Sequence, residues 1–341
     1  MPAENRRLPS PALPIHNTIK IACRPAPQRQ TTRSTKDTNK SRGTPVTTSA
    51  AINPPAKVTV IGLGNMGRPM AACIARAGFQ VTGFDLSAEA RSAFAKEGGT
   101  AAATIGEAIA GAEAIVTLLP DGKIVRAAIE GIKTKLAKGT VIIDMSSSAP
   151  LGTRALGEEL IADGFEFVDA PVSGGVKRAV SGTLAIMAGG SHASIDRADK
   201  ILLSMGAAAF RTGPLGSGHA AKALNNYVSA AGLAAAAEAL AIGSKFGIEP
   251  NTLVDVLNAS TGRNNSTENK LKQFMISESY ASGFAMALMA KDIQTADDLA
   301  HQIGVKAPLA DEITAMWNAA LEQLGPKSDH TEIGRYLTAD K

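Results

Sequence analysis

A lysine and two amides share one face of an alanine-rich stretch near the middle of the chain. Within AAKALNNYVSAAGLAAAAEAL, residues 220–240, the only charged residues are Lys222 and Glu238. Alanine favours the helix more than any other residue, and residues three and four apart share a helical face. We therefore expect Asn225 and Asn226 beside Lys222. Such a lysine can lay its stem on apolar surface and keep its amine in water, or it can move a proton if burial lowers its pKa.

A glycine motif predicts a dinucleotide site. GLGNMG, residues 62–67, has the G-x-G-x-x-G spacing. It follows the β-branched segment KVTVI and opens the helical segment NMGRPMAACIARAG, which is the context that makes this weak pattern specific. The first glycine permits a tight turn, the second lets the backbone approach a pyrophosphate, and the third allows close helix–strand packing. The residues expected at the cofactor are Gly62, Leu63, Gly64, Asn65, Met66 and Gly67.

Asp85 ends the next β-like segment, QVTGFD, 18 residues after Gly67. A carboxylate at this point can accept hydrogen bonds from the adenosine ribose and would repel the 2′-phosphate of NADP. Leu86 and Ser87 follow it, so no arginine stands immediately beside it. The sequence therefore predicts NAD rather than NADP as the cofactor.

Two further stretches carry polar residues suited to a substrate. In DAPVSGGVKRAVSGTLAIMAGG, residues 169–190, we expect a loop at Ser173, Gly174 and Gly175 whose backbone N–H groups and hydroxyl suit a carboxylate. In STGRNNSTE, residues 260–268, Arg263 and Asn264 either contact a second polar group of the substrate or cap helices at the surface. Both interpretations of this second stretch stay open.

The chemistry-bearing stretches must be positioned by alternating strands and helices. Strand-like segments (KVTVI, QVTGFD, AIVTLLP, TVIIDMS, FEFVDAP) alternate with helical ones as far as about residue 216, and only helical patterns follow. This order predicts an α/β Rossmann domain with a doubly wound, mainly parallel sheet. We expect it over residues 57–216, with an all-helical substrate and oligomerisation domain over 217–341, joined by a long interdomain helix.

The first 56 residues differ from the rest in composition. They hold nine Lys or Arg and two acidic residues, a net charge of +7, whereas the remainder carries −3. This proline-rich and hydroxyl-rich leader is expected to be disordered. It is either an organelle transit peptide, a plain leader, or the product of a wrongly chosen start codon. The mildly acidic body argues against nucleic-acid binding.

Four stretches resemble, in order and spacing, the motifs of the β-hydroxyacid dehydrogenases, a family that includes 3-hydroxyisobutyrate dehydrogenase. They are GLGNMG, DAPVSGGVKRAVSGTLAIMAGG, GPLGSGHAAKALNN and LMAKDIQTADDLA. The resemblance covers about residues 57–338. It implies that Lys222 is the catalytic lysine and Asn226 an active-site amide, with Asn225 beside it. It also implies that Ser173, Gly174 and Gly175 bind the substrate carboxylate. Residues implied on the nicotinamide side are Leu119, Pro120 and Ser147, with Lys291 reaching the cofactor from the helical domain.

The resemblance implies an NAD-dependent oxidoreductase that interconverts a small β-hydroxy acid with its semialdehyde or keto acid. One alternative is an NADP(H)-preferring reductase of a small semialdehyde, of the glyoxylate or tartronate semialdehyde type. Another is a non-catalytic binding module on the same fold. Decarboxylation of the 6-phosphogluconate type is disfavoured, because Asn225 and Ser229 stand where that enzyme has a histidine and a glutamate. Imine reductases replace the lysine, so Lys222 argues against them.

The remaining features receive simpler interpretations. The sequence shows no cluster with metal-ligand spacing, so no metal is expected. Asp297 and Asp298 are interpreted as a solvated helix face, and His219 as a loop or helix-cap residue. Two cysteines and no strongly apolar membrane span predict a cytoplasmic protein, with import through the leader left open. By resemblance the expected assembly is a homodimer or homotetramer.

Overall fold

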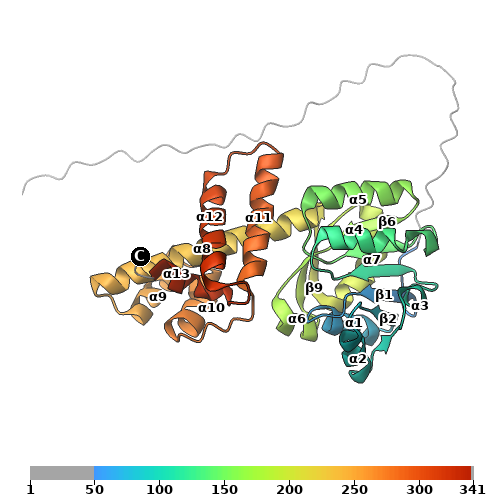
Figure 1. Ribbon diagram of the computed structural model, residues 1–341, viewed down its shortest axis with the longest axis horizontal. Coiled ribbons are helices and arrows are strands. Elements are labelled where there is room, and N and C mark those ends of the chain that lie inside the picture. Colours follow the sequence, from blue (N-terminus) through green and yellow to red (C-terminus); the bar gives the residue numbers. More distant parts are fainter. Residues whose placement is uncertain (1–49, 339–341) are drawn as a thin grey trace, which may run out of the picture. The chain divides into compact units, whose positions relative to one another are not determined.

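The computed structural model describes residues 50–338 and shows a mainly parallel sheet followed by a helical region (Figure 1). The predicted Rossmann fold class is therefore confirmed. Most of the predicted leader, residues 1–49, lies outside the described residues. Its last residues pack on the sheet region: Ile52 is 2 % exposed, and its backbone N–H donates to the carbonyl of Arg197. The folded region therefore begins before residue 57.

Nine strands form one sheet in the order β3-β2-β1-β4-β5-β6-β8-β7, with β9 paired to β8. The first six strands in this order run parallel, β8 runs antiparallel to β6, and β8 and β9 are parallel. The order 3-2-1-4-5-6 is that of dinucleotide-binding folds. The strands are β1 (Lys57–Ile61), β2 (Gln80–Phe84), β3 (Thr100–Ala101), β4 (Ala114–Thr117), β5 (Val141–Asp144), β6 (Glu166–Asp169), β7 (Val172–Ser173), β8 (Leu184–Gly189) and β9 (Gly206–Gly213).

The central strands are short and apolar because helices cover both faces of the sheet. All four residues of β4 and all four of β5 are buried. Two separate clusters of buried aliphatic side chains, built around Val60 and Ile115, make up the core of this region. Its helices are α1 (Gly67–Arg76), α2 (Ala88–Lys96), α3 (Ile105–Ala108), α4 (Gly122–Glu130), α5 (Pro150–Ala162), α6 (Gly175–Ser181) and α7 (His192–Met205), with the 3₁₀ turn η1 (Lys133–Lys135).

The helical region is built on one long helix, α8 (Ser217–Phe246), beside which α11 and α12 pack (Figure 1). Its core surrounds Trp317, which is fully buried and is the only tryptophan in the chain. The other elements are α9 (Pro250–Ala259), α10 (Asn265–Asn269), the π-helical η2 (Leu271–Ile276), α11 (Met286–Gln302), α12 (Pro308–Leu324), η3 (His330–Glu332) and α13 (Ile333–Thr338).

By length and composition alone, α8 is apolar enough to cross a membrane, a property that the sequence analysis did not expect of it. In the structure its buried face, which includes Leu233 and Ala237, packs into the helical core around Trp317. Core helices commonly meet the same criteria of length and hydropathy. This packing accounts for the apolar residues on the buried face of α8.

Candidate active site

The glycine motif forms a cradle between β1 and α1. Its three glycines differ in the space that a side chain would find. A Cβ on Gly62 would lie 2.2 Å from the carbonyl oxygen of Leu118, and this residue has φ +101°. A Cβ on Gly67 would lie 1.9 Å from the carbonyl oxygen of Gly62. A Cβ on Gly64, by contrast, would meet no atom within 4 Å. The turn is closed on its inner side and open at Gly64, where a pyrophosphate can approach the backbone. This geometry fits a dinucleotide, with Leu63, Asn65 and Met66 in the same turn.

Asp85 stands just after β2, beside the glycine turn. Its Oδ2 accepts a hydrogen bond of 2.7 Å from the backbone N–H of Leu63, and its Oδ1 accepts one of 2.9 Å from Ser87. These bonds fix the carboxylate next to the cradle, as a ribose-binding residue requires. The sequence analysis missed Arg91, whose Nη1 donates to the carbonyl of Asp85 at 2.5 Å. A cation therefore does lie near Asp85, brought there by the first turns of α2.

Lys222 is the first member of a chain of polar contacts that joins the helical region to the sheet region. Its Nζ lies 3.3 Å from Oδ1 of Asn226, to which Asn225 also donates at 3.0 Å. Nδ2 of Asn226 donates to Oδ2 of Asp292 at 2.6 Å, and Oγ of Ser147 donates to Oδ1 of Asp292 at 2.8 Å. Since an ionised carboxylate only accepts, Asp292 fixes the amide so that its oxygen faces Lys222.

The environment of Lys222 lowers the pKa of its amine below the usual value. Burial is the main cause, and the positive charge of Lys291 adds to it, while the carboxylate of Asp292 acts in the opposite direction. Desolvation disfavours the charged form of an amine, which makes the neutral base available at lower pH. No acid among residues 50–338 forms an ion pair with Lys222 within 4.0 Å. The amine is thus held by an amide and influenced by a carboxylate at longer range.

Residues predicted at the nicotinamide side meet at the ends of β4 and β5. Nζ of Lys291 donates to the carbonyl of Ser147 at 2.9 Å and to that of Pro120 at 3.2 Å. The backbone N–H of Leu119 donates to Oγ of Ser146. Carboxyl ends of neighbouring parallel strands are where ligands bind in open α/β sheets. The structure therefore brings Leu119, Pro120, Ser147 and Lys291 close together at these strand ends.

The predicted carboxylate loop is a strand end followed directly by a helix. Ser173 ends β7, Gly174 has φ +135°, and Gly175 has φ +66° and begins α6. Gly174 and Gly175 are exposed, and a Cβ on Gly175 would meet no atom within 4 Å. Within residues 50–338, no hydrogen bond links these three residues to Lys222 or Asn226. Ser173 pairs with Ala185 of β8, whereas Gly174 and Gly175 lie exposed at the start of α6, where a ligand can approach their backbone.

The start of α8 is fixed by buried groups that sequence reasoning did not identify. Asp169 is fully buried, and its carboxylate accepts from the backbone N–H groups of Gly216 and His219. His219 is 1 % exposed, and Nε2 donates to the carbonyl of Ser146 at 3.1 Å because a carbonyl can only accept. Its Nδ1 pairs with Oγ1 of Thr153 at 2.9 Å. His219 therefore anchors α8 to the strand ends, and the helix-cap interpretation was incomplete.

Arg263 and Asn264, for which two interpretations were left open, lie at the start of α10. Asn264 caps α10 by accepting from the N–H groups of Ser266 and Thr267. Arg263 forms a 2.8 Å ion pair with Glu268, and its side chain is 63 % exposed. Asn264 thus has the capping contacts of one interpretation, and Arg263 has an ion-pair partner at the surface.

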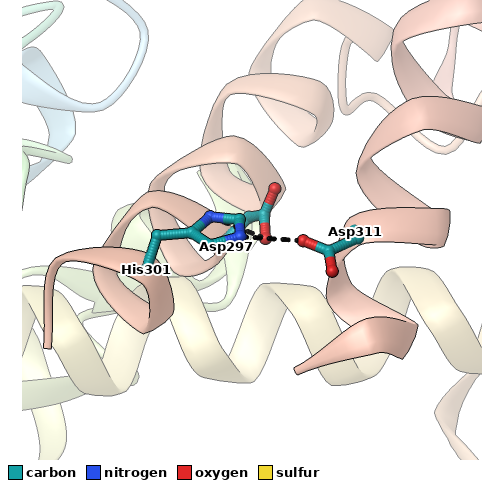
Figure 2. A group of neighbouring side chains, drawn as sticks. All are labelled: Asp297, His301 and Asp311. Atoms are coloured by element: carbon teal, nitrogen blue, oxygen red, sulfur yellow. Dashed lines mark ion pairs between the residues drawn. The ribbon is translucent and has the colours of Figure 1, made fainter. Parts of the chain in front are cut away.

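One group of side chains in the described residues has the chemistry of metal ligands, although the sequence analysis found none. Asp297 and His301 lie one turn apart on α11, and Asp311 faces them from α12 (Figure 2). Nε2 of His301 lies 3.0 Å from Asp311, and Nδ1 lies 3.6 Å from Asp297. The sequence did not reveal the group because its members come from two helices. Asp297 is also buried at 6 % exposure, so it is not the solvated residue that was expected. The contact of His301 with Asp311 links α11 to α12.

Comparison with known proteins gives the same family for both regions. Residues 57–213 match the family model described as the NAD binding domain of 6-phosphogluconate dehydrogenase. Residues 216–337 match that described as the NAD-binding domain of NADP-dependent 3-hydroxyisobutyrate dehydrogenase.

The match to each individual relative covers most of that relative's length. The chain is 35% identical over 264 residues to 2-(hydroxymethyl)glutarate dehydrogenase of Eubacterium barkeri, covering 76% of this chain and 88% of the relative. It is 36% identical over 261 residues to 3-hydroxyisobutyrate dehydrogenase of Pseudomonas aeruginosa, covering 74% and 88%. A solved structure of Mycobacterium tuberculosis 3-hydroxyisobutyrate dehydrogenase with L-serine matches with a TM-score of 0.79 at 32% identity, over 83% of this chain and 99% of that one.

These relatives are named as dehydrogenases, and the cofactor that both regions support is NAD, with NADP possible. The glycine cradle and the strand-end residues lie in the first matched region, and the long helix bearing Lys222 lies in the second. The chain is therefore an enzyme and belongs to the β-hydroxyacid dehydrogenase family.

Proposed function

We propose that this enzyme oxidises a small β-hydroxy acid to its semialdehyde or keto acid with NAD, and that Lys222 is its general acid and base. The observation that carries this proposal is the half-buried amine of Lys222, whose pKa is lowered by burial and whose hydrogen-bond partner is the amide of Asn226. A general base works best when its pKa lies near the working pH. A lysine ion-paired directly with an acid would not meet that condition.

The comparisons support a substrate with its hydroxyl on the β-carbon. The names of two relatives give 3-hydroxyisobutyrate and 2-(hydroxymethyl)glutarate, and a third relative was solved with L-serine. All three compounds carry a CH₂OH group on the carbon next to a carboxylate. We propose that Ser173, Gly174 and Gly175 bind that carboxylate through their backbone N–H groups and the Ser173 hydroxyl, and that Asn225 lies at the same site.

NAD held by the Gly62–Gly67 cradle would supply the hydride acceptor for the carbinol carbon. The chain's own part in the reaction is to move one proton. Neutral Lys222 Nζ accepts the proton of the substrate hydroxyl as the carbonyl forms, and the resulting ammonium donates to Oδ1 of Asn226. The same ammonium stabilises negative charge that develops on the substrate oxygen. In the reverse direction Lys222 returns the proton.

The cofactor contacts follow from the strand ends. We propose that Gly62 to Gly67 hold the pyrophosphate and that Asp85 holds the adenosine ribose. Leu119, Pro120, Ser147 and Lys291 then line the nicotinamide side. An NADP-preferring semialdehyde reductase is the second candidate, and the observation that favours it is the Arg91 guanidinium beside Asp85.

The test is the Lys222→Met variant, assayed with 3-hydroxyisobutyrate, 2-(hydroxymethyl)glutarate and L-serine, each with NAD and with NADP. We expect turnover to fall by at least roughly 10³-fold, since both the base and the oxyanion partner are lost. NAD affinity, measured by calorimetry, should stay within about threefold because the contacts proposed for Lys222 are to substrate.

Lys245→Met is the matched control, because Lys245 is an exposed lysine on the same helix. It should behave as the wild type. Retention of more than about a tenth of the wild-type turnover by Lys222→Met would contradict the proposed role. Faster turnover with NADP than with NAD would favour the second candidate.

We also propose that the enzyme is a homodimer or homotetramer and cytoplasmic. The outward face of α8 carries four large apolar side chains that are 48–85 % exposed. Successive members are 4, 14 and 4 residues apart, which places them along one line of the helix. This α8 stripe consists of Leu224, Val228, Ile242 and Phe246.

A further inference from the structure

The helical region contains a second partly buried lysine, Lys270, which no proposed step uses. Lys270 lies between α10 and η2, and its Nζ lies 3.4 Å from Oγ of Ser229 on α8. Among residues 50–338, no carboxylate comes within ion-pair distance of it. Asp329 acts on it from farther away, but that carboxylate already accepts bonds from Ser282, Gly283 and Thr331. The ammonium of Lys270 therefore lacks an anionic partner.

Burial makes this arrangement costly. It lowers the pKa of Lys270 to about 8, while Asp329 acts in the opposite direction. At neutral pH the side chain is still mostly an ammonium, so a partly desolvated charge sits without a counter-ion within ion-pair distance. Such a charge is normally paired. The neighbouring imidazole of His330, whose pKa is itself lowered by burial and by Lys270, supplies no negative charge. A missing anion is the simplest explanation of the arrangement.

The position of Lys270 connects it with the proposed active site. Its contact residue Ser229 lies three residues after Asn226 and seven after Lys222 on α8. Seven residues make nearly two helical turns, so Lys222, Asn226 and Ser229 share one face, and Ser229 lies about 10 Å along the axis from Lys222. An anion beside Lys270 would therefore lie on the same face of α8 as the reacting hydroxyl, one to two turns away.

We propose that Lys270 binds a second carboxylate of the substrate, so that the preferred substrates are β-hydroxy acids with an additional carboxylate at the end of a short chain. This inference rests on the proposed role of Lys222. In the complex, Lys270 Nζ donates to the distal carboxylate while Ser229 helps to orient it. Arg263, the other cation considered for this purpose, is already paired with Glu268 at the surface.

The test uses two probes with the same reacting end. In 2-(hydroxymethyl)glutarate a CH₂CH₂COO⁻ group replaces the methyl group of 3-hydroxyisobutyrate, and the 5-amide of the former is the neutral analogue. For the wild type we expect kcat/KM to be highest for the dicarboxylate. In Lys270→Met the ratio of dicarboxylate to monocarboxylate kcat/KM should fall roughly 10- to 100-fold, mainly through KM, as for loss of a charged hydrogen bond.

Three comparisons make this result specific. Lys270→Arg keeps the charge and should restore part of the ratio. Lys272→Met removes an exposed lysine two positions away, paired with Asp255, and should leave the ratio as in the wild type. The amide analogue should lose most of the advantage of the dicarboxylate with the wild type. A ratio in Lys270→Met within about twofold of the wild type would overturn the proposal.

A binding measurement separates this proposal from the role of Lys222. Glutarate, which has no hydroxyl and cannot react, is added to the NADH-saturated enzyme and the shift in Tm is measured. Wild type and Lys222→Met should both be stabilised, and Lys270→Met should show a much smaller shift. Equal shifts in all three would exclude Lys270 as the anion site, even if Lys222 proved essential. Loss of turnover without loss of the Lys270-dependent shift would concern Lys222 alone.

Discussion

At the scale of single residues, Asp292 determines how the proposed catalytic group is presented. It receives one hydrogen bond from Ser147 of the sheet region and one from Asn226 of α8. It also counteracts the lowering of the pKa of Lys222. No role could be assigned to this aspartate from its sequence position, although it follows Lys291 directly. Its importance depends on two partners that are 66 and 145 residues away.

The Asp292→Asn variant gives a pH test of this arrangement. The negative charge of Asp292 raises the pKa of Lys222, so its removal should lower that pKa further. In the oxidation direction the base must be neutral, and activity rises with pH as Lys222 deprotonates. The acidic limb of the kcat/KM profile should therefore move to lower pH.

We also expect about a tenfold loss of kcat in Asp292→Asn, because one of the two donors is left without its acceptor. Asp298→Asn, an exposed neighbour on the same helix, is the control and should leave both the profile and kcat in place. Movement of the acidic limb to higher pH would show that Asp292 does not act on Lys222 as described.

At the scale of elements, the β1–α1 turn separates two functions of glycine. Gly62 and Gly67 are required because backbone atoms approach each other across the turn, with only 1.9 Å available to a Cβ on Gly67. Gly64 faces open space. The absence of a side chain at Gly62 and Gly67 is needed for folding, whereas its absence at Gly64 leaves room for the ligand. Substitution by alanine can therefore distinguish them.

Gly67→Ala should be destabilised by roughly 3 kcal/mol or should fail to fold, since the clash is with backbone. Gly64→Ala should keep its stability within about 1 kcal/mol but weaken NAD binding at least about tenfold, because the new methyl group would meet the pyrophosphate. Urea unfolding and calorimetry with NAD measure the two effects.

Gly152→Ala, at an exposed and uncrowded position of α5, is the matched control and should be neutral or slightly stabilising. The assignment of separate roles would be wrong if Gly64→Ala bound NAD as tightly as the wild type.

Local sequence patterns predicted some of these elements and not others. The alternation of apolar strands and helices predicted the fold, and the positions of the glycine turn, Asp85 and Lys222 followed from motif spacing. The pairing of β7, β8 and β9 did not, because these strands lie in a glycine-dense stretch without a clear period. The partners of His219 and Lys270 were equally hidden, since they come from distant strands and helices. A pattern locates an element, whereas a buried polar contact requires the tertiary structure.

At the scale of the whole molecule, the α8 stripe is the feature that favours self-association. Large apolar side chains on one line of an exposed helix are typical of contacts between chains. Val228, at 66 % exposure, and Ile242, at 70 %, lie near its two ends. A second copy of the chain can cover this face because its own stripe has the same chemistry.

The double variant Val228→Glu, Ile242→Glu should shift the assembly towards monomers in light scattering, since it would place charges in a desolvated contact. Its secondary structure should be preserved, because both side chains point away from the core. Glu312→Gln, at an exposed position of α12, is the control. An unchanged molar mass for the double variant would place the interface on another surface.

Trp317 provides an optical signal confined to one part of the chain. It is the only tryptophan, it is fully buried among α8, α11 and α12, and its indole N–H has no hydrogen-bond partner in the described residues. Fluorescence excited at the red edge of protein absorption therefore reports the melting of the helical region alone, while circular dichroism reports both regions. Its emission overlaps the absorption of reduced nicotinamide, so energy transfer from this residue would register cofactor loading in the native enzyme, without an attached label.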